Sequence, residues 1–328
     1  MNPSGLHVVF GAGQVGLPLA RLLAARGRQV RLVSRSGRPP PGGTGVDGAI
    51  QVAAADAMDA AACRKAVEGA AVVYHCMTPV YDAAAWEAQL PPIQENLVAA
   101  AGRARARLVV LDNLYAVGRT GGRPMNESTP AAPCSRKGET RARVASSLRE
   151  AVRRGDVRAV TGRASDFFGP GGVLTAYGER FWKRLFAGKG AEVLGNPETL
   201  HTYHFIPDVA AGLAALGEAT EEASGAENGE AWILPCAPAG STRQLVAGFE
   251  AAAGIPAAVQ RMPRPMVKIL GLFMPILREV DEMLYQWDEP YVADDRAFRA
   301  RFGVLPTPPA EAARQTVAWA RSAYARQA

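Results

Sequence analysis

The sequence predicts an α/β fold, a doubly wound parallel sheet followed by a smaller C-terminal subdomain. Three observations predict this fold class. Apolar runs of strand length alternate with helical patterns through the first half of the chain. A glycine-rich turn, Gly11-x-Gly13-x-x-Gly16, joins the first apolar run to the first helical pattern. In the second half the alternation stops and helical patterns outnumber strands.

The expected elements follow from this periodicity. In the first half we expect strands at residues 7–10, 29–34, 49–54, 72–76, 108–112 and 157–163, and helices at residues 15–25, 60–67, 86–101 and 136–154. In the second half we expect helices at residues 181–186, 208–216, 243–253 and 265–284, and a strand at residues 231–234. The polar, acidic residues 220–229 are expected to form a mobile loop.

Composition limits the classes of function. The 328 residues are 48% hydrophobic, enough for a large core, and the formal net charge is +6. The basic residues are scattered and form no run with interleaved aromatics, so we expect no nucleic-acid partner. The four cysteines lie far apart, without a C-x-x-C pair or a histidine at ligand spacing. This pattern disfavours a metal site and indicates a reducing compartment.

The sequence also predicts a cytoplasmic protein without a membrane span. The first strand follows the N-terminus directly, which leaves no room for a signal peptide. The longest apolar run, residues 269–277, is too short to cross a bilayer and contains Pro275. The methionine-rich segment 266–277 around it suits a substrate lid or a core helix. A subunit contact or a helix lying on a membrane surface are the alternatives.

The glycine turn predicts a dinucleotide site. One glycine permits the tight turn, one lets a pyrophosphate approach the backbone, and one lets the helix pack closely on the strand. The helix N-terminus then offers free N–H groups and a partial positive charge to the phosphates. The expected contacts come from the turn and the helix start, namely Gly11, Gly13, Gln14, Val15 and Gly16.

Residues at the ends of the next strands are candidates for the rest of the cofactor, because ligands of open parallel sheets lie across the carboxyl ends of the strands. Ser34 and Arg35 follow the second strand, where an arginine can pair with a 2′-phosphate; they therefore favour NADP over NAD, and an ordinary solvated arginine is the alternative. Asp56 and Ala57 follow the third strand and are expected to meet the adenine, although Asp56 also suits a cap of the next helix. After the fourth strand come small, uncharged residues that are expected beside the ribose and phosphates: Cys76, Met77 and Thr78.

The fifth strand ends with candidate reactive groups. Asn113 and Tyr115 share a face if the strand continues. Lys137 follows in the first turn of the next helix, where the helix dipole disfavours a cation. That position indicates a functional lysine, a candidate both for catalysis and for cofactor binding, and a solvated lysine is the alternative.

Taken in order, these motifs resemble the epimerase/dehydratase branch of the extended short-chain dehydrogenases/reductases over essentially the whole chain. Besides the glycine turn, Asp56, residues 113–118 and Lys137, the matching segments are 162–171 (GRASDFFGPG), 205–210 (FIPDVA) and 302–308 (FGVLPTP). The resemblance implies a Rossmann-type sheet, a substrate-binding subdomain and bound NAD or NADP. We assign the first domain to residues 1–165, completed by about 205–235, and the subdomain to residues 166–204 and 236–328.

The resemblance also implies a reaction centre that this chain only partly has. In the family a Ser or Thr stands at a strand end, and a Tyr stands four residues before a Lys that lowers the tyrosine pKa. Here Asn113 occupies the Ser/Thr position and Pro133 the Tyr position, so only Lys137 matches. Proline has no exchangeable proton, and the chain therefore resembles an atypical member.

Three possibilities follow for proton transfer. Tyr115 is the first candidate acid, with a packing aromatic as the alternative, and Asn113 then donates a hydrogen bond to the substrate. Asp166 stands where the resemblance places a substrate-facing residue and is a candidate base, with loop capping as the alternative. The third possibility is that no proton is transferred. In the run 201–204, Tyr203 and His204 are candidate substrate contacts, and structural histidines in a strand are the alternative.

We therefore expect an NAD(P)-dependent oxidoreductase of the epimerase/dehydratase type, NADP-preferring, with a non-standard active site. Its substrate is a small carbonyl, hydroxyl or sugar-type compound, and its state is a monomer or homodimer. The competing hypothesis is a catalytically inactive NADP(H)-binding sensor or regulatory protein. A nucleic-acid-binding role would rest on the net charge alone.

Overall fold

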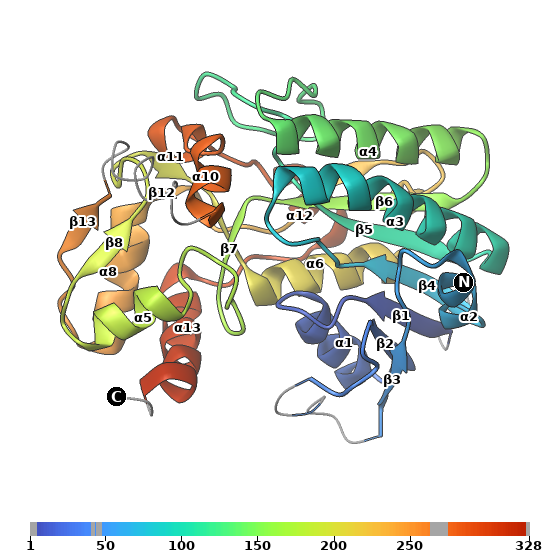
Figure 1. The fold of residues 1–328 in the computed structure, drawn as a ribbon, viewed down its shortest axis with the longest axis horizontal. Coiled ribbons are helices and arrows are strands. Elements are labelled where there is room, and N and C mark those ends of the chain that lie inside the picture. Colours follow the sequence, from blue (N-terminus) through green and yellow to red (C-terminus); the bar gives the residue numbers. More distant parts are fainter. Residues whose placement is uncertain (1–4, 41–42, 44–47, 263–274, 326–328) are drawn as a thin grey trace.

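The structure is a computed structural model that describes residues 5–40, 43, 48–262 and 275–325. Its centre is a seven-stranded sheet in the order β11-β6-β5-β4-β1-β2-β3, in which every neighbouring pair is parallel (Figure 1). The chain runs outward from β1 to β3 and then returns to β4 on the other side of β1. This is the doubly wound sheet that the sequence predicts.

The strands of this sheet lie where the sequence predicts them, with small shifts at their ends. They are β1 (Leu6–Phe10), β2 (Val30–Ser34), β3 (Ile50–Ala54), β4 (Ala70–His75), β5 (Arg107–Asn113), β6 (Arg158–Ala164) and β11 (Ala231–Ile233). Their sequences are mostly apolar because a parallel sheet is covered on both faces.

Helices cover the two faces of the sheet (Figure 1). On one face lie α2 (Ala60–Ala66), α3 (Ala83–Ala104) and α4 (Arg136–Arg153), and on the other lie α1 (Gly16–Ala25) and α6 (Ile206–Glu218). The pleat of β1 divides its side chains between two cores, because Val8 belongs to the first and Val9 to the second. All five helices are predicted by the helical periodicity.

The smaller part of the chain is built from short elements beside the sheet (Figure 1). Its strand pairs are β7 (Asp166–Phe168) with β10 (Tyr203–Phe205), β8 (Ala191–Val193) with β13 (Val259–Arg261), and β9 (Leu200–His201) with β12 (Gly240–Ser241). Its helices are α5 (Glu179–Phe186), α8 (Thr242–Ala253), α10 (Pro275–Asp281), α11 (Tyr285–Asp288) and α13 (Pro309–Tyr324). An aromatic core that contains Trp182 and Phe249 holds α5, α8 and α13 together. A further helix, α12 (Arg296–Phe302), packs on β11.

The prediction of a mobile loop at residues 220–229 is wrong. The segment contains α7 (Glu221–Ser224), whose first turn is capped by Thr220, and Ser224 is buried. One acidic residue of the segment forms an ion pair, since the Glu221 carboxylate lies 3.2 Å from the guanidinium of the fully buried Arg107. Arg107 also donates to the carbonyls of Leu216 and Ala219 at the end of α6. The pairing with a buried arginine fixes the segment to the sheet.

Of the helix predicted at residues 265–284, only residues 275–284 belong to the part of the chain that the structure describes. Its C-terminal portion forms α10, and a turn then leads into α11. Most of the methionine-rich segment 266–277 lies outside the described residues, which resume at residue 275. Among the helices that the structure describes, none is long and apolar enough to cross a membrane.

Candidate functional site

The glycine turn lies at the carboxyl edge of the sheet, where the strand order reverses between β1 and β4. Gly11 has a φ of +107°, and a Cβ there would lie 2.8 Å from the carbonyl oxygen of Cys76. A Cβ on Gly16 would lie 1.9 Å from the carbonyl oxygen of Gly11. A Cβ on Gly13, by contrast, would meet nothing within 4 Å. Two glycines are therefore required by the protein itself, and the middle one leaves open space of the kind that a pyrophosphate needs.

The start of α1 fits an anion. Its N-cap residue, Val15, makes no side-chain cap, and the first turn contains no acidic residue. The first N–H groups of the helix are thus not used by a side chain, and no carboxylate opposes a phosphate. The side chain of Gln14 accepts a hydrogen bond from the backbone N–H of Leu174 at 3.3 Å and so connects the turn to the loop after β7.

The end of β2 carries positive charge without acid. Arg35 is exposed, and among the described residues no carboxylate pairs with it. Ser34 accepts a hydrogen bond from the N–H of Gly37 at 3.2 Å, which turns the chain directly after the strand. Arg38 is exposed in the same turn. The residues therefore suit a phosphate better than a ribose diol that needs a carboxylate acceptor.

At the end of β3, the structure rules out the alternative that Asp56 caps the next helix. Asp56 does not cap α2; the cap is Asp59, whose carboxylate accepts from the N–H groups of Ala61 and Ala62. Asp56 instead accepts from the N–H of Met58 at 3.0 Å, in a tight turn, and is exposed. This leaves Asp56, with the buried Ala57, at the edge of the sheet where the adenine is predicted.

The loop after β4 is uncharged. Burial raises the pKa of the Cys76 thiol to about 12, so the thiol is neutral at ordinary pH. Cys76 and Met77 are half-buried, and Thr78 is exposed. Because the carbonyl of Cys76 closes on Gly11, this loop forms one wall of the glycine turn.

Asn113 ends β5, and the strand does not continue to Tyr115 as the shared-face argument assumed. The chain turns instead, and the side-chain oxygen of Asn113 accepts from the N–H of Tyr115 at 3.1 Å. The two residues are still held together, but by an Asx turn rather than by strand geometry. Among the described residues, nothing accepts a hydrogen bond from the Asn113 amide nitrogen.

Tyr115 lies in an aromatic cluster. Its ring stacks on Trp86 with centroids 5.9 Å apart, and its hydroxyl lies 3.4 Å from the hydroxyl of Tyr81. Burial, followed by the charges of nearby groups including Asp166, raises the Tyr115 pKa well above its usual value. The hydroxyl therefore remains protonated at neutral pH, which suits hydrogen-bond donation and disfavours a tyrosinate. Tyr81 was missed, although it follows a strand end like the other candidates.

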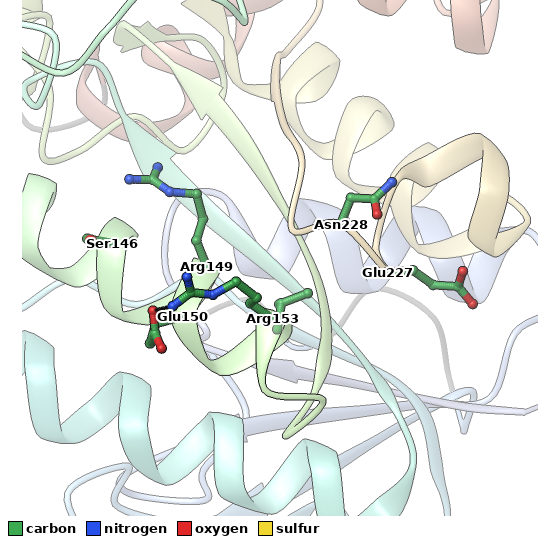
Figure 2. Close-up of a pocket in the computed structure, with 7 residues that line it drawn as sticks. Ser146, Arg149, Glu150, Arg153, Glu227 and Asn228 are labelled. Atoms are coloured by element: carbon green, nitrogen blue, oxygen red, sulfur yellow. Dashed lines mark hydrogen bonds and ion pairs between the residues drawn. The ribbon is translucent and has the colours of Figure 1, made fainter.

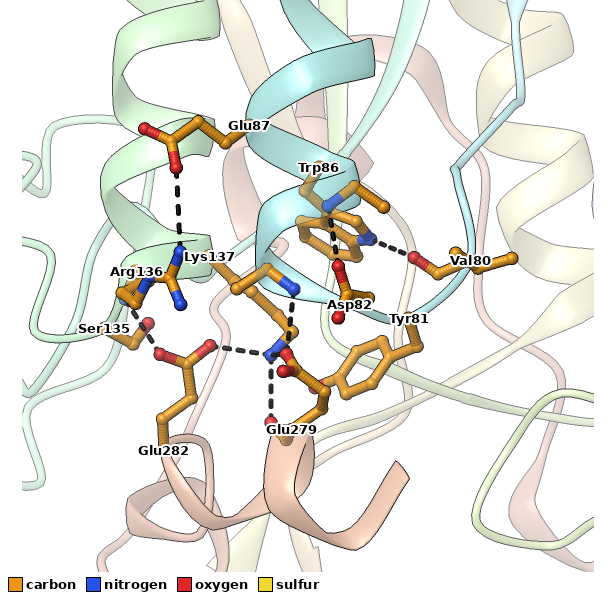
Figure 3. Close-up of polar contacts among 12 residues, drawn as sticks. Val80, Tyr81, Asp82, Trp86, Glu87, Ser135, Arg136, Lys137, Glu279 and Glu282 are labelled. Atoms are coloured by element: carbon orange, nitrogen blue, oxygen red, sulfur yellow. Dashed lines mark hydrogen bonds and ion pairs between the residues drawn. The ribbon is translucent and has the colours of Figure 1, made fainter. Parts of the chain in front are cut away.

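Lys137 is fully buried in the first turn of α4, and carboxylates from the distant α10 region hold its ammonium (Figure 3). The Nζ donates to Glu282 at 2.7 Å, to the Glu279 backbone carbonyl at 2.9 Å, and to the Glu279 carboxylate. The same glutamates accept from backbone N–H groups of Ala83 and Arg136, at the starts of α3 and α4.

This arrangement corrects the alternative of a solvated lysine. An ammonium group has three N–H donors, and all three are used here. A contact between the Lys137 ammonium and the cofactor therefore requires Glu279 or Glu282 to move away. The local sequence around Lys137 does not predict either glutamate as its partner, because they lie 142 and 145 residues further along the chain.

Asp166 pairs with a histidine. It begins β7, and its Oδ2 lies 2.8 Å from Nε2 of His201. The His201 side chain is fully buried, whereas the Asp166 side chain is 22% exposed. Asp166 is therefore not a simple loop cap. The only sign of this pairing in the sequence is the presence of two histidines in the run 201–204.

Tyr203 and His204 use their polar atoms inside the protein. The Tyr203 hydroxyl lies 2.7 Å from the Thr242 hydroxyl, within the aromatic core. The His204 ring accepts from the N–H of Ser165 at 3.0 Å and contacts the Leu234 carbonyl at 3.2 Å. Both are buried, and burial lowers the His204 pKa to about 4. This placement matches the alternative of structural residues in a strand.

A shallow hollow on the opposite edge of the sheet has no connection with these groups (Figure 2). It is lined by the C-terminal half of α4 and the turn before β11, through Ser146, Arg149, Glu150, Val152, Arg153, Glu227 and Asn228. These segments lie at the amino ends of the strands, away from the edge where ligands of parallel sheets bind. We therefore place the candidate site at the carboxyl edge.

Known structures share the fold of the whole chain. A UDP-glucuronic acid 4-epimerase from Bacillus cereus, solved with NAD, has a TM-score of 0.77 at 16% identity, with 97% of this chain and 99% of that chain covered. A dTDP-glucose 4,6-dehydratase from Streptomyces venezuelae has a TM-score of 0.77 at 16% identity, covering 98% and 100%. A nucleoside-diphosphate-sugar epimerase from Pseudomonas aeruginosa has a TM-score of 0.75 at 18% identity, covering 97% and 98%.

Comparison with curated proteins finds no significant match. The sequence model of the NAD dependent epimerase/dehydratase family matches residues 7–228, from the start of the glycine-turn unit to the segment before β11. This stretch includes the glycine turn, the ends of β2 to β6, Lys137 and Asp166. The chain belongs to the NAD dependent epimerase/dehydratase family.

Proposed function

We propose that this protein is an NADP-preferring oxidoreductase that acts on a small carbonyl, hydroxyl or sugar-type compound through a non-standard active site. The proposal rests on the features that lie together at the carboxyl edge of the sheet. There, the open space at Gly13 and the acid-free arginine turn after β2 share one edge with the polar groups after β5 and β6.

The cofactor is assigned to residues of the glycine turn and the next strand ends. The pyrophosphate is placed over Gly13 at the start of α1, and the 2′-phosphate beside Ser34 and Arg35. Asp56 and Ala57 are assigned to the adenine, and the loop of Cys76, Met77 and Thr78 to the ribose and phosphates. When bound, the nicotinamide ring supplies hydride transfer. The solved relative that contains NAD supports a nicotinamide dinucleotide.

The substrate oxygen is assigned to donors at the end of β5. The Asn113 amide nitrogen has no acceptor among the described residues and can donate to a carbonyl or hydroxyl oxygen, because the Asx turn uses only the side-chain oxygen. Tyr115 supplies a second, neutral hydroxyl. Lys137 is assigned a positioning role in this arrangement, because it holds α10 against Tyr81 and the starts of α3 and α4.

The cofactor assignment predicts opposite effects of alanine at two glycines. Gly13→Ala should leave the fold intact, since its Cβ meets nothing within 4 Å, and should weaken NADPH binding about tenfold or more. Gly16→Ala places a Cβ 1.9 Å from a carbonyl oxygen and should destabilise the fold by about 1–3 kcal/mol or more. Nicotinamide fluorescence titration and urea unfolding measure the two effects. Unchanged NADPH affinity in a folded Gly13→Ala protein would rule out the assigned pyrophosphate position.

The charge at the end of β2 predicts cofactor preference. Arg35→Asp should lower the affinity for NADPH by about 10–100-fold, because a charge-assisted contact is replaced by repulsion, and should change NADH affinity little. Arg149→Asp is a matched control, since it makes the same charge change on an exposed residue at the opposite edge. Equal losses for both cofactors, or no loss for either, would contradict a role for Arg35 in 2′-phosphate recognition.

The oxidoreductase activity itself is tested by NADPH consumption with a panel of aldehydes, ketones and nucleotide sugars. Asn113→Asp keeps the oxygen that accepts from Tyr115 but removes the amide donor, and it should lower kcat/KM by about 100-fold. Binding of NADPH without turnover of any compound would instead favour the sensor hypothesis. An unaffected Asn113→Asp enzyme would remove Asn113 from the reaction centre.

A further inference from the structure

His201 is buried with both ring nitrogens engaged. Its Nδ1 lies 2.9 Å from the backbone carbonyl oxygen of Gln286, and its Nε2 lies 2.8 Å from the Asp166 carboxylate. The Ser165 hydroxyl is a third neighbour, 3.4 Å from Nε2. The His201 side chain is 0% exposed, so water does not share these contacts.

The hydrogen-bond chemistry requires one proton more than a neutral histidine and an ionised aspartate possess. A backbone carbonyl only accepts, so Nδ1 must carry the hydrogen of that contact. A neutral imidazole then presents a lone pair at Nε2, directly toward a carboxylate oxygen at 2.8 Å. Two acceptors at this distance repel each other unless a proton lies between them.

We infer that the His201–Asp166 pair holds a proton between Nε2 and Oδ2 at neutral pH, and that the second Asp166 oxygen exchanges a proton with the substrate oxygen. The exchange with the substrate rests on the proposed function, whereas the proton between His201 and Asp166 does not. The pair supplies the acid–base group that Pro133 cannot supply. Asp166 is the catalytic residue in this assignment, and His201 is a positioning residue that acts through it.

The position of Asp166 agrees with this role. In the parallel register of β5 and β6, Asn113 lies opposite Ala164. Two residues further along each chain come Tyr115 and Asp166, so both leave the same edge of the sheet. Burial is the main cause that raises the pKa values of Tyr81 and Tyr115, and the charge of Asp166 contributes to both. The more exposed member of the pair therefore leaves the sheet at the same edge as the proposed donors to the substrate oxygen.

The proposed step balances. In oxidation, the O–H bond of the substrate alcohol breaks and its proton moves to the free Asp166 oxygen. The adjacent C–H bond breaks with its electron pair, which leaves as hydride to the oxidised nicotinamide, and a C=O bond forms. In reduction the proton returns from Asp166 to the substrate oxygen. Because Asp166 is 22% exposed, the pair can exchange the additional proton with solvent.

The remaining neighbours of His201 do not replace Asp166 as its counter-charge. Its ring packs on Tyr203, Trp287 and Tyr291, with centroids 4.4, 5.6 and 5.5 Å away. Burial raises the pKa values of Tyr203 and Tyr291, so both hydroxyls are neutral. His204 is also kept neutral by burial. Within the described part of the chain, Asp166 is thus the ionisable partner that faces the His201 ring.

Imidazole ¹⁵N spectra of the cofactor-free protein, with ¹³C spectra of the aspartate carboxyls, test the proton directly. Of the four histidines, three should be neutral at pH 7, because burial lowers the pKa values of His7, His75 and His204 to about 4, 3 and 4. The fourth histidine, His201, is identified by the signal that disappears in the His201→Gln variant. It should be protonated on both nitrogens or paired with a protonated Asp166. In Asp166→Asn it should be singly protonated. A neutral His201 beside an ionised Asp166 in the unmodified protein would overturn the inference.

Turnover tests the catalytic half of the inference. Asp166→Asn should bind NADPH normally and lose activity by about 100-fold or more, and Asp156→Asn, an exposed aspartate before β6, is the matched control. His201→Gln should shift the pH profile of kcat/KM, which a purely structural role would not do. Full activity of Asp166→Asn would overturn the acid–base role. Failure of the unmodified protein to turn over any compound would reject the proposed function, whereas the spectra would still decide whether the proton is present.

Discussion

The close approach of α1 to the turn after β1 is the constraint on which the rest of the site depends. Gly16 lies so near the Gly11 carbonyl that no side chain fits between them. That contact fixes the start of α1 at the carboxyl edge of the sheet, where no side chain caps the helix and a Cβ on Gly13 would meet nothing within 4 Å. The ends of β2 and β3 then lie on one side of this turn and the end of β4 lies on the other, because the parallel strands end at the same edge of the sheet.

The proposed reaction centre is organised differently from the glycine turn. Its groups come from segments far apart in the chain, and buried polar contacts hold them in place. Lys137 joins α4 to Glu279 and Glu282, and Asp166 pairs with His201 across β7 and β9. Breaking one partner of such a buried pair leaves a charge without compensation, which is costly. These contacts therefore restrict both the position of α10 and the position of the proposed acid.

The family resemblance and the chain's own residues lead to different chemistry at this centre. Lys137 is retained, yet its three donors are used by α10. At the position where the resemblance implies a tyrosine, the chain has Pro133, which lies beside the turn of Tyr115. The Asp166–His201 pair stands at a neighbouring strand end and offers an exchangeable proton there. We interpret the site as one that shares the family's glycine turn for the cofactor but has its acid–base group at Asp166, at a different strand end.

Much of the fold was predictable because its signals are local. Strand length, helical periodicity and glycine spacing located the sheet, its five covering helices and the turn between β1 and α1. The capping of α2 by Asp59 rather than Asp56 was beyond such patterns, since both suit a cap and only geometry selects between them. The partners of Lys137 and Asp166 were not predictable for a stronger reason. Glu279 lies 142 residues from Lys137 and His201 lies 35 residues from Asp166, so no periodicity connects them.

Calorimetric titration of the unmodified protein with NADPH and with NADH tests the central claim most directly, because every assignment at the sheet edge assumes that a nicotinamide dinucleotide lies there. We predict one NADPH bound per chain, about tenfold tighter than NADH, which corresponds to one charge-assisted contact at Arg35. Binding of neither cofactor by the folded protein would contradict the account.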